Sequence, residues 1–412
     1  MKKIKETILI VLLLANLGTY VQSQNTNNQT SSPYSYYGLG NINDINTGKT
    51  NSLGRSGIAM PSNNSINNLN PASFGSIPLN SFLFDIGVRA DKEALTANGF
   101  VEPRFNANFS NMAFAFPLSK KSALAITLIP FTNVGYILSG IESEIEGSND
   151  TYVTDVEGSG GLNDIKINYG FSFSEKLRLG VYGSYLFGKI EEQEINYIGD
   201  NLLLIEEDNF YNGFRLGLGF QYDINKNISV GSIINFPTSL QGDQEKVVST
   251  LSDTPSNSEE TLNSFKFPLE FGFGAHIKLK EKLFFNIDYK RNFWEATNQS
   301  DYLGDYKNQD FFGAGVEYTP NADKFKFWQR VNYRLGFNLD NGNLLINDKN
   351  ITNYAFNLGL GLPLNNKKSR INIGYTYGQK GEVLNGLVKE NYHTLTINLS
   401  LEDLWFVKRK FN

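Results

Sequence analysis

Large apolar residues occupy every second position through most of the chain between residues 79 and 402. The clearest example is the stretch 265–279, in which Phe271 and Phe273 fall on one side of an extended chain and Glu270 falls on the other. Successive side chains of a β-strand point to opposite faces. This period of two therefore predicts strands that have one apolar and one polar face.

Fourteen segments carry this pattern, and most are much longer than the ~5–6 residues typical of strands in soluble proteins. They lie near residues 79–90, 104–118, 122–138, 161–175, 177–195, 208–224, 227–237, 264–280, 282–297, 308–320, 328–341, 351–364, 369–383 and 389–402. Tight connections alternate with long ones, as on the two rims of a bacterial outer-membrane barrel. A sheet in lipid has to close on itself so that every backbone group is paired. The pattern predicts an all-β protein, a 14-stranded antiparallel transmembrane barrel.

The apolar faces of the strands are expected to meet acyl chains, and the faces rich in Gly, Asn and charge to line the lumen. Charges of the luminal face could pair with the N-terminal segment, line a hydrated passage or anchor an anionic head group. The candidates are Arg89, Arg178, Arg215, Glu270, Asp288, Lys290 and Arg334. Several Tyr and Trp residues near strand ends are expected in the aromatic girdles where a barrel meets the membrane surface, the alternative being ordinary packing on the sheet. They are Tyr136, Tyr197, Tyr289, Trp294, Tyr375, Tyr377 and Trp405.

Composition excludes several classes of function. The 412 residues include 37 Lys and Arg against 42 Asp and Glu, and no basic stripe predicts a nucleic-acid partner. The chain has no Cys and only two His, so we expect no enzyme activity and no cofactor. Residues 139–160 and 191–208 are acidic and lack Lys and Arg. We interpret them as solvated loops, because their spacing matches no metal-binding motif, and we predict no metal site.

The N-terminal part has a different composition. Residues 1–23 combine three lysines with a short apolar run and predict a signal peptide, followed by a flexible leader at 24–32. Residues 33–78 lack strand periodicity, whereas 403–412 form a basic tail after the barrel at 79–402. A fourteen-stranded barrel is too wide to be filled by its own wall. We therefore expect 33–78 to plug the lumen as a hatch, the alternative being a disordered periplasmic arm.

Two short stretches carry a family resemblance. Residues 53–59 (LGRSGIA) and 69–73 (LNPAS) resemble the N-terminal hatch of the FadL family of outer-membrane transporters for long-chain fatty acids and other hydrophobic compounds. The hatch residues that the resemblance implies are Gly54, Gly57, Ala59, Asn70, Pro71 and Ala72. Residues 32–40 and 404–411 resemble the Bacteroidota-type branch, which includes barrels that accompany the type 9 protein-secretion translocon. The resemblance implies an outer-membrane location with both barrel termini in the periplasm.

Two irregularities lie in neighbouring strands. Pro130, near the middle of the third segment, cannot donate a ladder hydrogen bond. The second segment changes parity near Ser110, which requires one extra residue there. In FadL-type transporters a kink in the third strand opens a window from lumen to bilayer, and the resemblance implies that Ile129, Pro130, Phe131 and Thr132 line one here. The alternative is a local bulge without an opening.

These expectations lead to two hypotheses of function. In the first, a plugged barrel passes a hydrophobic, fatty-acid-like small molecule sideways into the outer-membrane lipid near the third strand. In the second, a closed barrel docks on or plugs the large channel protein of the type 9 translocon. The sequence alone discriminates poorly between them.

Overall fold

A computed structural model describes residues 30–43, 46–145, 147, 150–199, 201–250, 254–301, 304–321, 326–364, 368–383 and 386–404. The predicted signal peptide, the leader as far as residue 29 and the tail from residue 405 lie outside the described residues. Within the described part, no helix is long and apolar enough to cross a membrane.

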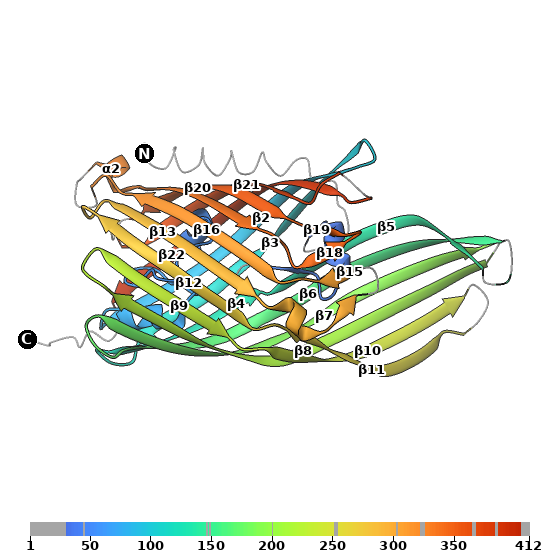
Figure 1. The fold of residues 1–412 in the computed structure, drawn as a ribbon, viewed down its shortest axis with the longest axis horizontal. Helices are drawn as coiled ribbons and strands as arrows, with labels where there is room; N and C mark the ends of the chain where they lie inside the picture. The colour runs from blue at the N-terminus through green and yellow to red at the C-terminus, as the bar shows by residue number, and fades with distance from the viewer. Residues whose placement is uncertain are drawn as a thin grey trace, which may run out of the picture.

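The described chain forms one closed antiparallel barrel (Figure 1). Its fourteen strands follow chain order, and three of them consist of two consecutive elements that share a neighbouring strand. They are β2 (Ser81–Ala97), β3 (Phe100–Pro117), β4 with β5 (Ser122–Pro130, Thr132–Glu144), β6 (Thr151–Ser172), β7 (Leu177–Ile198), β8 (Asn201–Asp223), β9 with β10 (Ile228–Asn235, Thr238–Thr250), β11 with β12 (Ser256–Phe267, Glu270–Leu279), β13 (Leu283–Asn292), β16 (Gln309–Tyr318), β17 (Asn332–Asp340), β20 (Asn353–Pro363), β21 (Arg370–Lys380) and β22 (Lys389–Leu404). Pairing of β2 with β22 closes the ring. The predicted fold class is confirmed.

Short elements lie between and inside these strands. The N-terminal segment contains η1 (Pro33–Tyr36), β1 (Asn41–Ile42), η2 (Gly48–Ser52) and η3 (Pro71–Ser76). Two loops join in a small sheet of β14 (Ser300–Asp301), β15 (Gly304–Tyr306), β18 (Leu344–Ile346) and β19 (Lys349–Asn350). The remaining elements are η4 (Trp294–Thr297) and α2 (Phe327–Arg330).

The polarity of the barrel is inverted relative to a soluble protein. On the outer face, the side chains of Phe214 and Phe356 are 76% and 55% exposed. On the inner face, Asn168, Gln221 and Asn338 are fully buried. An apolar outer surface and a polar interior are what a barrel needs in order to meet hydrocarbon on its outside.

The bulge expected near Ser110 is present. The ladder between β2 and β3 pairs Gly87 with Asn111 and then Val88 with Phe109, which leaves Ser110 as the extra residue. Both apolar stretches of β3 therefore face outward although they differ in sequence parity.

The interpretation of the acidic segments as loops was wrong. Most of 139–160 and 191–208 is strand, in β5, β6, β7 and β8. Residues 238–250 and 256–263, which lie outside the predicted strands, form most of β10 and β11. These strands extend well past the rest of the wall (Figure 1). We call the apolar band on the outer face of the barrel the apolar belt. Beyond this belt neither face of a strand has to be apolar, so the strand pairing continues without the alternation of apolar and polar residues on which the prediction relied.

The girdle assignment was wrong for two aromatic residues. Tyr136 and Trp294 are only 4% and 2% exposed, and both belong to an apolar cluster in the interior. Trp294 lies in η4, which follows β13, and its ring stacks on Tyr306 of the small sheet at a centroid distance of 5.1 Å. A loop that folds inward carries it into the lumen.

Candidate functional site

The N-terminal segment packs against the inner face of the barrel wall. Gly54 has φ +63°, and a Cβ atom at this position would lie 2.3 Å from the carbonyl oxygen of Ala314 and 2.4 Å from that of Phe337. Only glycine permits both this backbone conformation and this approach to β16 and β17. The wall also needs a glycine at this contact, because a Cβ atom on Gly336 of β17 would lie 2.1 Å from the backbone nitrogen of Gly54.

Hydrogen bonds join the next residues of the segment to the wall. The backbone nitrogens of Gly57 and Ile58 donate to Asp288 Oδ2 on β13 at 2.6 and 2.9 Å. The carbonyl oxygen of Ile58 accepts from Gln221 Nε2 on β8 at 2.9 Å. Ala59 follows and is 1% exposed.

Asn70 connects two parts of the segment with the wall. Its Nδ2 donates to Ile58 O at 2.8 Å and to Phe220 O on β8 at 3.0 Å. Its Oδ1 accepts from the backbone nitrogen of Ala72 at 2.9 Å and so caps η3, which begins at Pro71. This side-chain cap satisfies an N–H at the start of the short helix.

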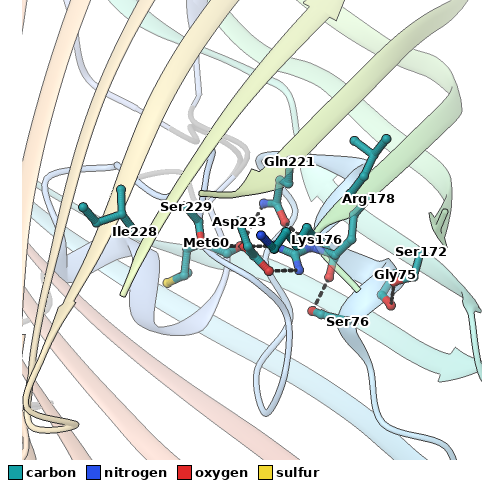
Figure 2. Close-up of polar contacts among 12 residues, drawn as sticks. Met60, Gly75, Ser76, Ser172, Lys176, Arg178, Gln221, Asp223, Ile228 and Ser229 are labelled. Atoms are coloured by element: carbon teal, nitrogen blue, oxygen red, sulfur yellow. Dashed lines mark hydrogen bonds and ion pairs between the residues drawn. The ribbon is translucent and has the colours of Figure 1, made fainter. Parts of the chain in front are cut away.

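η3 itself rests on β6, β7 and β8. Ser172 Oγ donates to Gly75 O at 2.7 Å, and Gln221 Nε2 reaches Met60 O at 3.2 Å (Figure 2). A Cβ on Gly180 of β7 would lie 2.3 Å from Ala72 N. The glycines that alternate along the strands are thus the places where the backbone of the N-terminal segment approaches the wall.

The predicted luminal charges all belong to the inner face. Arg178 makes two 2.7 Å hydrogen bonds to Asp223 (Figure 2), and Arg334 donates to Glu317 at 2.6 Å. Arg89 pairs with Asp91 at 2.8 Å. These three arginines therefore have charged partners on the wall, as expected for buried ions.

Five of the predicted luminal charges border an open cavity of about 310 Å³ in the lumen: Arg89, Arg215, Glu270, Asp288 and Lys290. Glu270 accepts a hydrogen bond from Asn235, and Lys290 lies over the ring of Phe311 at 4.3 Å. Arg215 lies over Phe131 at 5.8 Å. The cavity also reaches residues 108–110 of β3 and 129–133 at the junction of β4 and β5.

The wall is incomplete at that junction. β3 pairs with β4 only from Met112 opposite Leu128 to Pro117 opposite Ala123. Over residues 100–111, β3 is paired with β2 alone, and β5 is paired with β6 and with the two residues of β1. Among the described residues, no ladder joins β3 to β5. We call this unpaired boundary, between residues 100–111 and β5, the β3–β5 gap.

The end of the gap nearest β4 is defined by a proline and a break in the strand. β4 ends at Pro130 and β5 begins at Thr132. The backbone nitrogen of Phe131 donates to Leu162 O on β6 at 2.6 Å, so the chain stays attached on that side. Ile129, Phe131 and Thr132 are each at most 3% exposed. All four residues named from the resemblance border the cavity.

A short strand of the N-terminal segment covers part of the free edge of β5. β1 pairs Asn41 with Asn133 and Ile42 with Thr132. The backbone nitrogen of Asn43 donates a hydrogen bond to Phe131 O at 2.8 Å, and its Nδ2 donates one to Pro130 O at 3.2 Å. The sequence offered no signal for β1, because two residues are too few to show a period.

The part of the wall that extends past the other strands carries a half-buried acid, Glu192. Tyr136 donates its hydroxyl proton to Glu192 on β7, beyond the apolar belt. Burial raises the pKa of the Glu192 carboxyl above its usual range, although the hydrogen bond from Tyr136 opposes this shift. Within the described ranges, no group of three or more His, Asp or Glu side chains is placed to hold a metal ion.

The fold, a 14-stranded antiparallel barrel with its N-terminal segment on the inner face, is similar to the folds of several solved transporters. The toluene transporter TbuX of Ralstonia pickettii is similar, with a TM-score of 0.65 at 15% identity over 87% of this chain and 98% of that one. The Pseudomonas putida toluene transporter TodX gives 0.59 at 14% identity, over 88% and 99% of the two chains. A Pseudomonas aeruginosa FadL homologue gives 0.58 at 10% identity, over 88% and 98%.

A comparison with protein families matches the BamG family over residues 2–412. The chain belongs to the BamG family. A comparison with curated proteins gives no match.

Proposed function

We propose that this barrel lies in the outer membrane, is plugged by residues 33–78, and passes a hydrophobic small molecule from the lumen into the bilayer through the β3–β5 gap. The observation that carries this proposal is that the luminal cavity reaches the β3–β5 gap. The luminal cavity is bordered by residues 108–110 and 129–133, which lie on the two sides of the gap at its end nearest β4. The similar folds of hydrocarbon transporters support it.

Proline on both sides favours an opening over a bulge. Pro130 ends β4, and Pro103 lies in the stretch of β3 that is paired with β2 alone. Neither residue has a backbone N–H to donate across the gap. The interruption at Pro237 leaves β9 and β10 paired with strands on both sides. A proline in a strand is therefore not sufficient for a gap.

Closure of the lumen by the N-terminal segment rests on its contacts. Gly54, Gly57 and Asn70 each meet a different part of the wall, from β8 to β17. An ordered segment held on several strands blocks the direct aqueous route, so the gap is the remaining exit for an apolar solute.

The test is uptake of a labelled hydrophobic substrate by cells that have no other route for it. Pro130→Val should restore a donor and reduce uptake severalfold, whereas Pro237→Val, which also alters an interrupted strand, should leave uptake unchanged. Both proteins should be checked for folding by their heat-dependent mobility in detergent gels. Equal uptake by a folded Pro130→Val protein and the wild type would contradict the proposal.

A second candidate is a structural subunit of a larger outer-membrane assembly. Its support is the one-sided extension of the wall, in which β7 and β8 have 22 and 23 residues and carry several glutamates. The family name BamG points to a Bam-associated protein, and the resemblance points to the type 9 translocon. Isolation from native membranes separates the candidates, because a stoichiometric large partner supports the second and a lone barrel with bound lipid supports the first.

A further inference from the structure

One side of the luminal cavity is a continuous wall of aromatic rings. Phe131, at the junction of β4 and β5, contacts Phe267 of β11 at a centroid distance of 5.1 Å. Phe267 contacts Trp294 at 5.8 Å, and Trp294 stacks on Tyr306 at 5.1 Å. All four rings border the cavity and all are less than 10% exposed. Such a surface accepts a planar apolar group by stacking or edge contact.

Two hydrogen-bond donors at this wall have no partner. The Nε atom of Arg215 and the Nε1 atom of Trp294 are buried and unbonded among the described residues. Arg215 is 9% exposed, and its described contact is with the ring of Phe131. A buried donor without an acceptor is unfavourable, and a buried arginine without one is more so. Their lack of partners marks the places where a ligand can supply oxygen.

The nearby acids do not fill this role. Glu270 accepts a hydrogen bond from Asn235, which in turn accepts one from Tyr182. Glu270 and Asp164 act on Arg215 through their charge, but neither makes an ion pair with it. They offset part of its positive charge and leave its hydrogen-bonding capacity unused. An acceptor on a bound molecule would satisfy the guanidinium without displacing a partner.

We propose that this cavity binds a planar aromatic molecule that carries an oxygen acceptor, such as an aromatic carboxylate, rather than a bare hydrocarbon. The ring of the ligand lies against Phe131, Phe267 and Trp294, and its oxygen accepts from Arg215. This proposal names the substrate class of the proposed transport route and rests on that function for its biological use. Binding itself does not require transport, so the two can be tested separately.

The chemical preference follows from what each ligand leaves unsatisfied. A hydrocarbon such as toluene would cover the buried donors and leave both without an acceptor. An aromatic carboxylate makes the same ring contacts and adds a charge-assisted hydrogen bond to Arg215. Unlike a purely apolar pocket, this cavity therefore favours a ligand that carries a hydrogen-bond acceptor.

The experiment measures equilibrium binding of labelled benzoate and labelled toluene to the full-length protein in lipid nanodiscs. Benzoate should bind at least tenfold more tightly than toluene. Arg215→Gln should weaken benzoate binding at least tenfold and leave toluene binding unchanged, as expected for loss of one charge-assisted hydrogen bond. Arg291→Gln, which changes a wall arginine paired with Asp310 outside the cavity, is the matched control.

Trp294→Phe provides a second variant in case Arg215→Gln fails to fold. It keeps an aromatic ring and removes one N–H, so benzoate affinity should fall severalfold while toluene affinity holds. Toluene binding as tightly as benzoate, or benzoate binding unaffected by both variants, would overturn the assignment. If benzoate binds as expected but Pro130→Val leaves its uptake intact, the ligand site stands and the lateral route fails.

Discussion

The Oδ2 atom of Asp288 lies 2.6 Å from the backbone nitrogen of Gly57, and this contact fastens the N-terminal segment to the middle of the barrel wall. The same oxygen accepts from the next residue, Ile58, at 2.9 Å. A carboxylate that accepts two backbone donors makes strong hydrogen bonds. The wall therefore holds the segment in place at this point.

Replacement of Asp288 should loosen the segment while the barrel stays folded. Asp288→Ala removes the acceptor of two hydrogen bonds, each worth about 1.5–3 kcal/mol when one partner is charged. We expect a protease to cleave residues 46–60 at least tenfold faster in the folded variant. Asp243→Ala, on the exposed face of β10, is the control. Equal cleavage in the two variants would show that Asp288 does not hold the segment.

The close approach at Gly54 predicts a difference between two glycines of similar backbone conformation. Gly54 and Gly99 have φ of +63° and +82°, so alanine is strained at both by about 1 kcal/mol. Only at Gly54 would the new Cβ meet wall carbonyls, since nothing lies within 4 Å of one at Gly99. Gly54→Ala should therefore release the segment to protease, and Gly99→Ala should not. Similar protection of both variants would argue against tight packing on β16 and β17.

Stability of the extended wall should depend on pH through Glu192. Burial raises the pKa of Glu192 in the folded protein, so its charged form opposes folding. This cost is absent below the carboxyl's unfolded pKa, about 4.3, and is complete above the raised value. Glu192→Gln should thus be more stable than the wild type to urea at pH 8, with the difference vanishing near pH 4. Glu259→Gln, at an exposed side chain, is the comparison.

A variant Glu192→Gln that is less stable than the wild type at pH 8 would mean that the hydrogen bond from Tyr136 outweighs the burial of the charge. The direction of the change at high pH therefore decides which of the two effects controls this acid.

The period of two predicted the barrel because lipid imposes apolarity on one face of every strand that crosses it. The same reasoning explains its failure at 238–263, where the strands continue outside that constraint and Asp243 and Glu245 occupy the outer face. Pro130 and Ser110 were visible in the sequence, because a missing N–H and a change of parity are local signals. The contacts of Asn43 with Pro130 O and Phe131 O were not, since they join residues 87 or more positions apart.

Hydrogen exchange of the backbone amides of β3 in lipid nanodiscs tests the gap most directly. Peptides that cover residues 100–111, paired with β2 alone, should exchange much faster than those that cover 112–117, which are paired on both sides. Pro130→Val should slow the exchange of the first group and leave the second unchanged. Uniform protection along the whole of β3 in the wild-type protein would mean that the wall is closed at this position and that no lateral route exists.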